Sequence, residues 1–204
     1  MTKDKKNADT HIGEHIFCYS WPVEGDNQLL NEGVCFINVD LAGVTAIRDY
    51  VEAKAQSLGL DERQSFELSL ISDELVANAV VATSLKELSE IVVFRWKHHK
   101  DNFGISVLDY GGGLDLPRVY KEIPVGDTLE EFINELKVYK DKSSVKVRNH
   151  GKIIEHARFG RGLRIVNGLV DSLGIKFHAE GGTISKTISK ETIGTIISVI
   201  YNTR

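Results

Sequence analysis

Two polar side chains, Glu74 and Asn78, stand four residues apart within a largely apolar segment. Residues four apart share one face of an α-helix, so the carboxylate and the amide would lie side by side. An amide oxygen is a hard ligand that suits Mg²⁺, and a neighbouring carboxylate can accept or orient a proton. The spacing therefore indicates a polar site on a helix. The alternative is that both side chains simply face solvent.

A second carboxylate, Asp109, ends an alternating segment and is followed by Gly111 and Gly113. A carboxylate at the end of a strand can accept a hydrogen bond from an exocyclic amine such as that of adenine. Glycines permit positive φ angles and let the backbone approach a flat ligand closely. A tight turn after an edge strand would give the same pattern.

The run Gly160-Arg161-Gly162-Leu163 opens a segment with helical spacing of apolar residues. The first turn of a helix offers unpaired N–H groups and the positive end of the helix dipole, which together favour phosphate. Arg161 and Arg164 add positive charge. The run matches neither the dinucleotide-binding fingerprint nor the P-loop, and a glycine-rich loop before an ordinary helix is the simpler alternative.

A threonine, Thr195, follows Gly194 at the entrance to the last β-prone segment. Its hydroxyl would share a water or a hydrogen bond with a ligand held by Asp109. Threonine also favours strands in general, so this feature gains its meaning from its place after the other three.

Apolar periodicity predicts the elements that must position these residues. Helices are expected over 41–58, 61–82 and 162–173, with Asp61 as an N-cap, and another around Leu129, Phe132, Ile133 and Leu136. Strands are expected over 16–21, 34–39, 90–97, 103–108, 174–179, 183–189 and 195–201. Helices and strands mix without βαβ alternation. We therefore expect an α+β fold, a two-layer α/β sandwich whose mixed, mostly antiparallel sheet carries helices on one face.

A chain of 204 residues suits one domain. We expect a flexible N-terminal extension over 1–31 and a single domain over 32–204, with a long lid at 114–159. The later part of the lid is rich in lysine and arginine. It is either a solvated, mobile loop, or a lid whose cations screen a triphosphate or dock an acidic partner.

Charge and composition exclude several classes of function. A net charge of −4 provides no global attraction to nucleic acid or to an anionic membrane. No apolar run approaches the roughly 20 residues of a membrane span, and the polar N-terminus resembles no signal peptide. We therefore expect a cytoplasmic protein that binds neither nucleic acid nor membrane. Cys18 and Cys35 would then be free, buried thiols, although pairing is the alternative.

In their order along the chain, the four features resemble those of the GHKL, or Bergerat-fold, ATPases. This superfamily includes gyrase, Hsp90, MutL, histidine kinases and anti-sigma-factor serine kinases. Residues 74–80 are similar to the N box, 109–113 to the G1 box and 160–163 to the G2 box, within a resemblance that covers about 36–201.

The resemblance implies ATP and Mg²⁺ as cofactors. It assigns proton transfer to Glu74, Mg²⁺ binding to Asn78 and adenine recognition to Asp109. The implied nucleotide-binding residues are Asn78, Asp109, Gly111, Gly113, Gly160, Arg161, Gly162, Leu163 and Thr195.

Within the superfamily, the size of the chain and its N box look most like the stand-alone anti-sigma serine/threonine kinases. That branch implies a homodimer that sequesters a sigma factor and phosphorylates a small STAS-type anti-sigma antagonist on serine. Two alternatives remain at this point. One is a nucleotide-gated protein-binding module without phosphoryl transfer, and the other is an interaction protein that binds no nucleotide.

Overall fold

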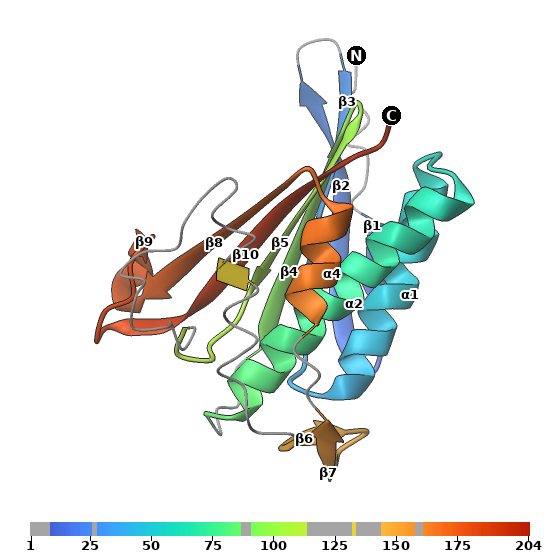
Figure 1. Cartoon of the computed structure of the whole chain (residues 1–204). Helices are drawn as coiled ribbons and strands as arrows, with labels where there is room; N and C mark the ends of the chain where they lie inside the picture. Colours follow the sequence, from blue (N-terminus) through green and yellow to red (C-terminus); the bar gives the residue numbers. More distant parts are fainter. Residues whose placement is uncertain (1–8, 26–27, 87–90, 114–131, 134–143, 158–160) are drawn as a thin grey trace, which may run out of the picture.

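The computed structural model describes residues 9–25, 28–86, 91–113, 132–133, 144–157 and 161–204. Three helices of this part lie on one face of a large twisted sheet (Figure 1). The sheet order is β1-β2-β3-β4-β5-β10-β8-β9, and each pair of neighbours is antiparallel. The predicted two-layer α/β sandwich is therefore confirmed.

The strands of this sheet are short to medium in length. They are β1 (Asp9–Ile12), β2 (Ile16–Gly25), β3 (Gln28–Ile37), β4 (Val92–His99), β5 (Asn102–Leu108), β8 (Ser172–Ala179), β9 (Ile184–Ser185) and β10 (Thr192–Asn202). A 3₁₀ turn, η1 (Glu180–Gly182), joins β8 to β9. Within the predicted strand over 183–189, Ile184–Ser185 form the short strand β9, which pairs with β8.

The helices begin and end close to where the periodicity predicts. They are α1 (Leu41–Ser57), α2 (Glu62–Ser84) and α4 (Gly162–Leu169). Asp61 caps α2 through a reciprocal pair of hydrogen bonds with Gln64, a capping box that satisfies two backbone N–H groups. The third helix is shorter than predicted, because the backbone becomes extended at Val170 and continues into β8.

The core lies between the helices and the sheet. Alternate residues of the central strands face the helices, as the period of two requires. These buried side chains are Val92, Phe94, Trp96, Phe103, Ile105, Val107, Ile197, Val199 and Tyr201. The helices contribute the apolar stripes of α1 and α2, including Ile47, Val51, Leu68, Ile71 and Leu75. The sheet thereby holds α2 firmly in place.

The N-terminal region differs from the prediction. Instead of a flexible extension, residues 9–12 and 16–25 form β1 and β2, and residues 28–31 begin β3. Residues 1–8 and 26–27 lie outside the described residues. The reason is burial: Ile16, Cys18 and Ser20 are almost fully buried, so β2 forms part of the core rather than a tail. The exposed strand β1 pairs along the edge of β2.

The prediction that both cysteines are free is also wrong. Cys18 of β2 and Cys35 of β3 are direct partners in the strand register, with their Cα atoms 4.0 Å apart, and they form a disulfide. Both side chains are fully buried. The pairing follows from the register of the β2–β3 hairpin, which the sequence pattern alone does not fix.

Part of the predicted lid is a hairpin. Strands β6 (Ser144–Asn149) and β7 (Lys152–Ala157) pair with each other alone, and Figure 1 shows them beside one end of α1 and α2. Val145 and Val147 pack against Val81 and Leu41. The basic stretch is therefore regular and anchored over residues 144–157. Apart from the buried residues 132–133, the rest of the region 114–143, including most of the predicted helix, lies outside the described residues.

The hairpin is held by the carboxylate of Asp40, the N-cap of α1. This carboxylate accepts hydrogen bonds from the N–H of Ala42 at 2.8 Å and from the N–H groups of His150 and Gly151, each at 2.9 Å. His150 and Gly151 have φ angles of 47° and 75°, the values of a two-residue hairpin turn. Asp40 thus joins a helix start to a turn far away in sequence.

Among the described residues, no helix combines the length and the apolar character that a membrane crossing requires.

Candidate functional site

The first feature of the site is a close contact between α4 and α2. Gly162, the first residue of α4, lies against both Glu74 and Asn78. A Cβ atom at residue 162 would overlap Oε2 of Glu74 and would lie 3.0 Å from Nδ2 of Asn78. The fold therefore brings three predicted site residues together, and a side chain at residue 162 would require Glu74 and Asn78 to shift.

The polar groups at this contact are perturbed. Burial, and then the neighbouring carboxylate of Asp73, raise the pKa of Glu74. A carboxylate with a raised pKa is a better base near neutral pH. The Nδ2 atom of Asn78 is buried and has no hydrogen-bond partner among the described residues. Because an unpaired buried amide is costly, this atom is suited to donate to a ligand oxygen.

The second feature is the turn that follows β5. Gly111 packs on α2, where a Cβ atom would lie 2.5 Å from the Cβ of Ala82. Gly112 and Gly113 have φ angles of 78° and 89°, which other residues rarely adopt. The N–H of Gly112 donates to the carbonyl of Ile193 at 3.0 Å. Gly111 therefore holds the turn against α2, while Gly112 ties it to β10.

Asp109 lies at the base of this turn and is 6% exposed. Burial raises the pKa of its carboxyl to about 6, while hydrogen bonds from the backbone of Gly111 and Thr195 and the nearby His178 act in the opposite direction. Its Oδ1 accepts the N–H of Gly111 at 2.7 Å. A buried carboxylate with few fixed partners is suited to accept a hydrogen bond from a ligand amine.

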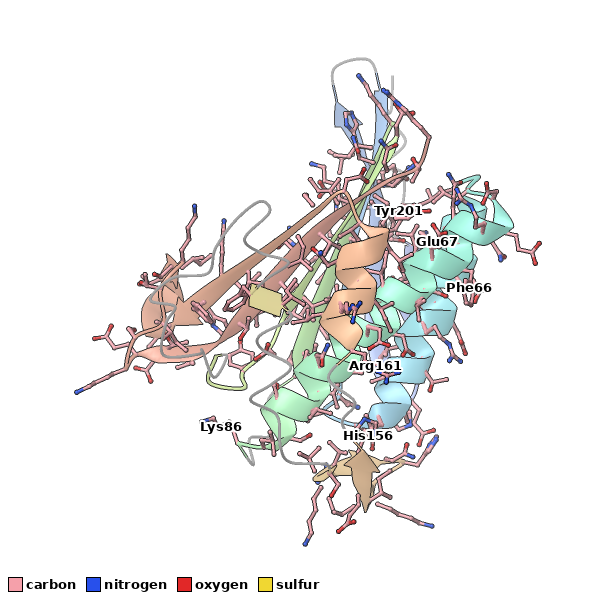
Figure 2. The ribbon with its side chains drawn as sticks, viewed as in Figure 1. Phe66, Glu67, Lys86, His156, Arg161 and Tyr201 are labelled. Atoms are coloured by element: carbon pink, nitrogen blue, oxygen red, sulfur yellow. A yellow bond between two sulfur atoms is a disulfide. The ribbon has the colours of Figure 1, made fainter. Side chains whose placement is uncertain are left out.

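The remaining predicted residues fall around these two features. Thr195 is buried, and its carbonyl accepts the N–H of Asp109 at 3.0 Å. Leu163 packs against the core, and Arg161 is exposed at the beginning of α4, as Figure 2 shows. Gly160 lies outside the described residues.

Three residues near the site were not predicted: Thr83, Lys86 and His178. Lys86, labelled in Figure 2, follows the end of α2 and lies over Gly112, where a Cβ atom would be 2.6 Å from its Cε. No helical period marks it in the sequence, because it lies beyond the end of α2. His178 and Thr83 contact the turn only through the tertiary fold, and no sequence motif marks them.

These residues suit a nucleotide and its metal ion. Carboxylate and amide oxygens are the hard donors that Mg²⁺ prefers, together with substrate phosphates and water. In the described part of the chain, no group of three or more His, Cys, Asp or Glu residues forms a protein-only metal cage. A Mg²⁺ ion that relies on Asn78 and on phosphate oxygens fits this donor set.

The comparisons with known proteins agree with this geometry. The family model of the histidine kinase-like ATPase domain matches residues 37–188, which is more than half of the chain. A search of curated proteins finds no match. The chain therefore belongs to the histidine kinase-like ATPase domain family, and its resemblance to the GHKL ATPases is confirmed; it is an ATP-binding domain of the ATPase type.

Proposed function

Because the chain belongs to this family, we propose that it is an ATP-dependent serine/threonine kinase of the anti-sigma-factor type. It would sequester a sigma factor and phosphorylate an anti-sigma antagonist on serine. The observation that carries the proposal is the contact of Gly162 with Glu74 and Asn78, which places a helix N-terminus beside a carboxylate with a raised pKa.

Each part of this site has a role in phosphoryl transfer. The carboxylate of Asp109 accepts the exocyclic amine of adenine. The N–H groups of the first turn of α4 face the phosphates, and Arg161 adds positive charge. Mg²⁺, held by the amide oxygen of Asn78 when bound, neutralises phosphate charge.

Glu74 acts as the base in this proposal. As the serine oxygen of the antagonist bonds to the γ-phosphorus, its hydroxyl proton passes to the carboxylate of Glu74, and the bond from the γ-phosphorus to the oxygen of ADP breaks. Positioning and charge neutralisation supply most of the catalysis in reactions of this kind.

The anti-sigma assignment also includes a homodimer in the cytoplasm. Disulfides are uncommon in that compartment. The sulfur atoms of Cys18 and Cys35 are fully buried in this fold, which shields the bond from reductants in solution.

A label-transfer experiment tests the proposal. Wild-type protein, Glu74→Gln and Glu62→Gln are incubated with γ-labelled ATP, Mg²⁺ and a STAS-type antagonist protein. Glu62→Gln is the matched control, because it removes an exposed carboxylate from the first turn of the same helix. We expect label on the antagonist with wild type and Glu62→Gln, and almost none with Glu74→Gln.

The outcomes separate the alternatives. ATP binding without label transfer, in the presence of an antagonist that binds the chain, contradicts the kinase and supports a nucleotide-gated binding module. If ATP raises the melting temperature of neither wild type nor Glu62→Gln, the nucleotide site itself is wrong.

A further inference from the structure

The peptide group between Asp109 and Tyr110 is hydrogen-bonded at both its carbonyl oxygen and its N–H, by side chains from the sheet and from a helix. Its carbonyl oxygen, that of Asp109, lies 2.6 Å from Nε2 of His178 on β8. Its N–H, that of Tyr110, donates to Oγ1 of Thr83 on the last turn of α2 at 3.3 Å. His178 and Thr83 are 7% and 0% exposed, so neither contact competes with bulk water.

The contact with His178 has a defined direction. A backbone carbonyl can only accept, so Nε2 of His178 must carry the hydrogen and donate it. The ring of Tyr110 packs edge-on against the imidazole, with centroids 5.1 Å apart, and restricts its orientation. The protein therefore fixes a hydrogen on Nε2 and the position of this side chain.

The neighbouring strand provides the space for this hydrogen bond. Gly194 of β10 lies opposite His178, and a Cβ atom there would overlap both the carbonyl oxygen of Asp109 and Nε2 of His178. The register of β10 shifts between Thr192 and Gly194, as in a β-bulge. Bulges of this kind redirect a strand next to functional sites, and here the bulge lets His178 reach the turn.

The orientation of this peptide bond controls the direction of the Asp109 carboxylate. Oδ1 of Asp109 accepts the N–H of Gly111, two residues further along the chain. Rotation about the Cα–C bond of Asp109 would carry the following residues with it, move the N–H of Gly111 away from Oδ1 and free the carboxylate to turn. The N–H of Asp109 is bound to the carbonyl of Thr195. The contacts of His178 and Thr83 hold the backbone on the other side of the Asp109 Cα, so the point from which the carboxylate projects is fixed from both sides.

We propose that His178 and Thr83 are positioning residues that aim the Asp109 carboxylate at the exocyclic amine of adenine and thereby set the preference for ATP over GTP. Guanine carries a carbonyl oxygen where adenine carries the amine, and two acceptors repel each other. A fixed carboxylate therefore discriminates, whereas a mobile one turns away at little cost. This inference rests on the nucleotide site described above and names its source of specificity.

Nucleotide titrations of the full chain test the proposal. The dissociation constants for ATP and GTP, each with Mg²⁺, are measured by calorimetry for wild type, His178→Leu, His178→Gln, Thr83→Val and Thr83→Ser. His178→Leu and Thr83→Val each remove one hydrogen bond at similar side-chain volume. His178→Gln restores a donor at residue 178, and Thr83→Ser restores an acceptor at residue 83. Circular dichroism and melting temperature report whether each variant is folded.

We expect His178→Leu to weaken ATP binding about tenfold, the equivalent of one buried hydrogen bond, and to leave GTP binding unchanged. The ratio of the two constants then falls about tenfold. Thr83→Val lowers the ratio about threefold, because its hydrogen bond is longer, and His178→Gln and Thr83→Ser keep it near the wild-type value. A merely structural role would lower the melting temperature without changing the ratio.

An unchanged ratio in both folded variants, His178→Leu and Thr83→Val, overturns the proposal. If His178→Leu does not fold, Thr83→Val decides in the same way. A wild-type chain that binds neither nucleotide instead contradicts the ATP site itself, so the two failures are distinguishable.

Discussion

The substitution Asp109→Asn should stabilise the protein while it removes nucleotide binding. Asparagine keeps the shape of the side chain and an oxygen that accepts the N–H of Gly111, but it carries no charge. In the absence of a ligand, the buried carboxylate of Asp109 is a cost to the fold, because burial disfavours its charged form. Functional sites commonly trade stability for activity in this way.

The size of the effect follows from the pKa of this carboxyl, which burial raises from 3.8 to about 6. This shift of about two pKa units corresponds to roughly 3 kcal/mol, since one unit is about 1.4 kcal/mol. The folded protein binds the proton of the Asp109 carboxyl more tightly than the unfolded chain does. The contribution of this proton to the free energy of unfolding is therefore fully present below pH 3.8 and is lost as the pH rises through 6. The asparagine side chain of the Asp109→Asn variant does not ionise, so this variant does not lose stability between pH 3.8 and 6 for this reason.

Urea unfolding of the ligand-free protein at pH 4, 6 and 8 measures this difference. We expect Asp109→Asn to be more stable than wild type by up to about 3 kcal/mol at pH 8 and nearly equal to it at pH 4. Asp49→Asn, an exposed carboxylate, is the control and should change stability by about 0.5 kcal/mol or less at either pH. A variant that is less stable than wild type at pH 8, or a difference that is the same at pH 4 and 8, would refute the reasoning. Addition of ATP should stabilise wild type and not the variant.

Three further predictions concern residues around the site and the core. Gly162→Ala places a Cβ atom onto Glu74, so calorimetry should show ATP affinity reduced at least about tenfold. The control is Gly168→Ala, because a Cβ atom at residue 168 meets no other atom within 4 Å. Equal ATP affinities in the two variants would contradict the close packing of Gly162. Asp40→Ala removes the N-cap of α1 together with the two hydrogen bonds to the β6–β7 turn, and should cost about 2 kcal/mol in urea unfolding. Limited proteolysis should then cut first within the hairpin, and cleavage that begins elsewhere would argue against the clamp. Tyr201→Phe removes the hydrogen bond that Tyr201 of β10 donates to Glu67 of α2, two residues labelled in Figure 2. We expect a cost of about 1 kcal/mol in thermal unfolding. An unchanged melting temperature would show that water replaces Tyr201 as the partner of Glu67.

The helices show what local sequence predicts well. The helix predicted over 61–82 extends from Glu62 to Ser84, because Asp61 and Gln64 form its cap from neighbouring residues. The shared face of Glu74 and Asn78 follows from the helical period alone. The turn after Asp109 likewise follows from glycines that tolerate positive φ.

The N-terminal strands and the lid show where local sequence is insufficient. The polar segment before Ile16 has no period that marks a strand, and it forms β1 because β2 offers a free edge with which to pair. Residues 144–149 form a strand because residues 152–157 pair with them and Asp40 accepts hydrogen bonds from the turn between them. Both outcomes depend on partners that a window of neighbouring residues does not contain.

The sequence by itself determined where the three described helices begin, the α+β class and the spacing of Glu74, Asn78 and Asp109, since the dihedral preferences and periods that fix them act over a few residues. The tertiary structure alone decided that Gly162 meets Glu74, that Cys18 meets Cys35, and that His178 reaches the Asp109 carbonyl. These contacts depend on strand register and on the docking of helices onto the sheet. Such arrangements are set by the burial of the whole core rather than by any local pattern.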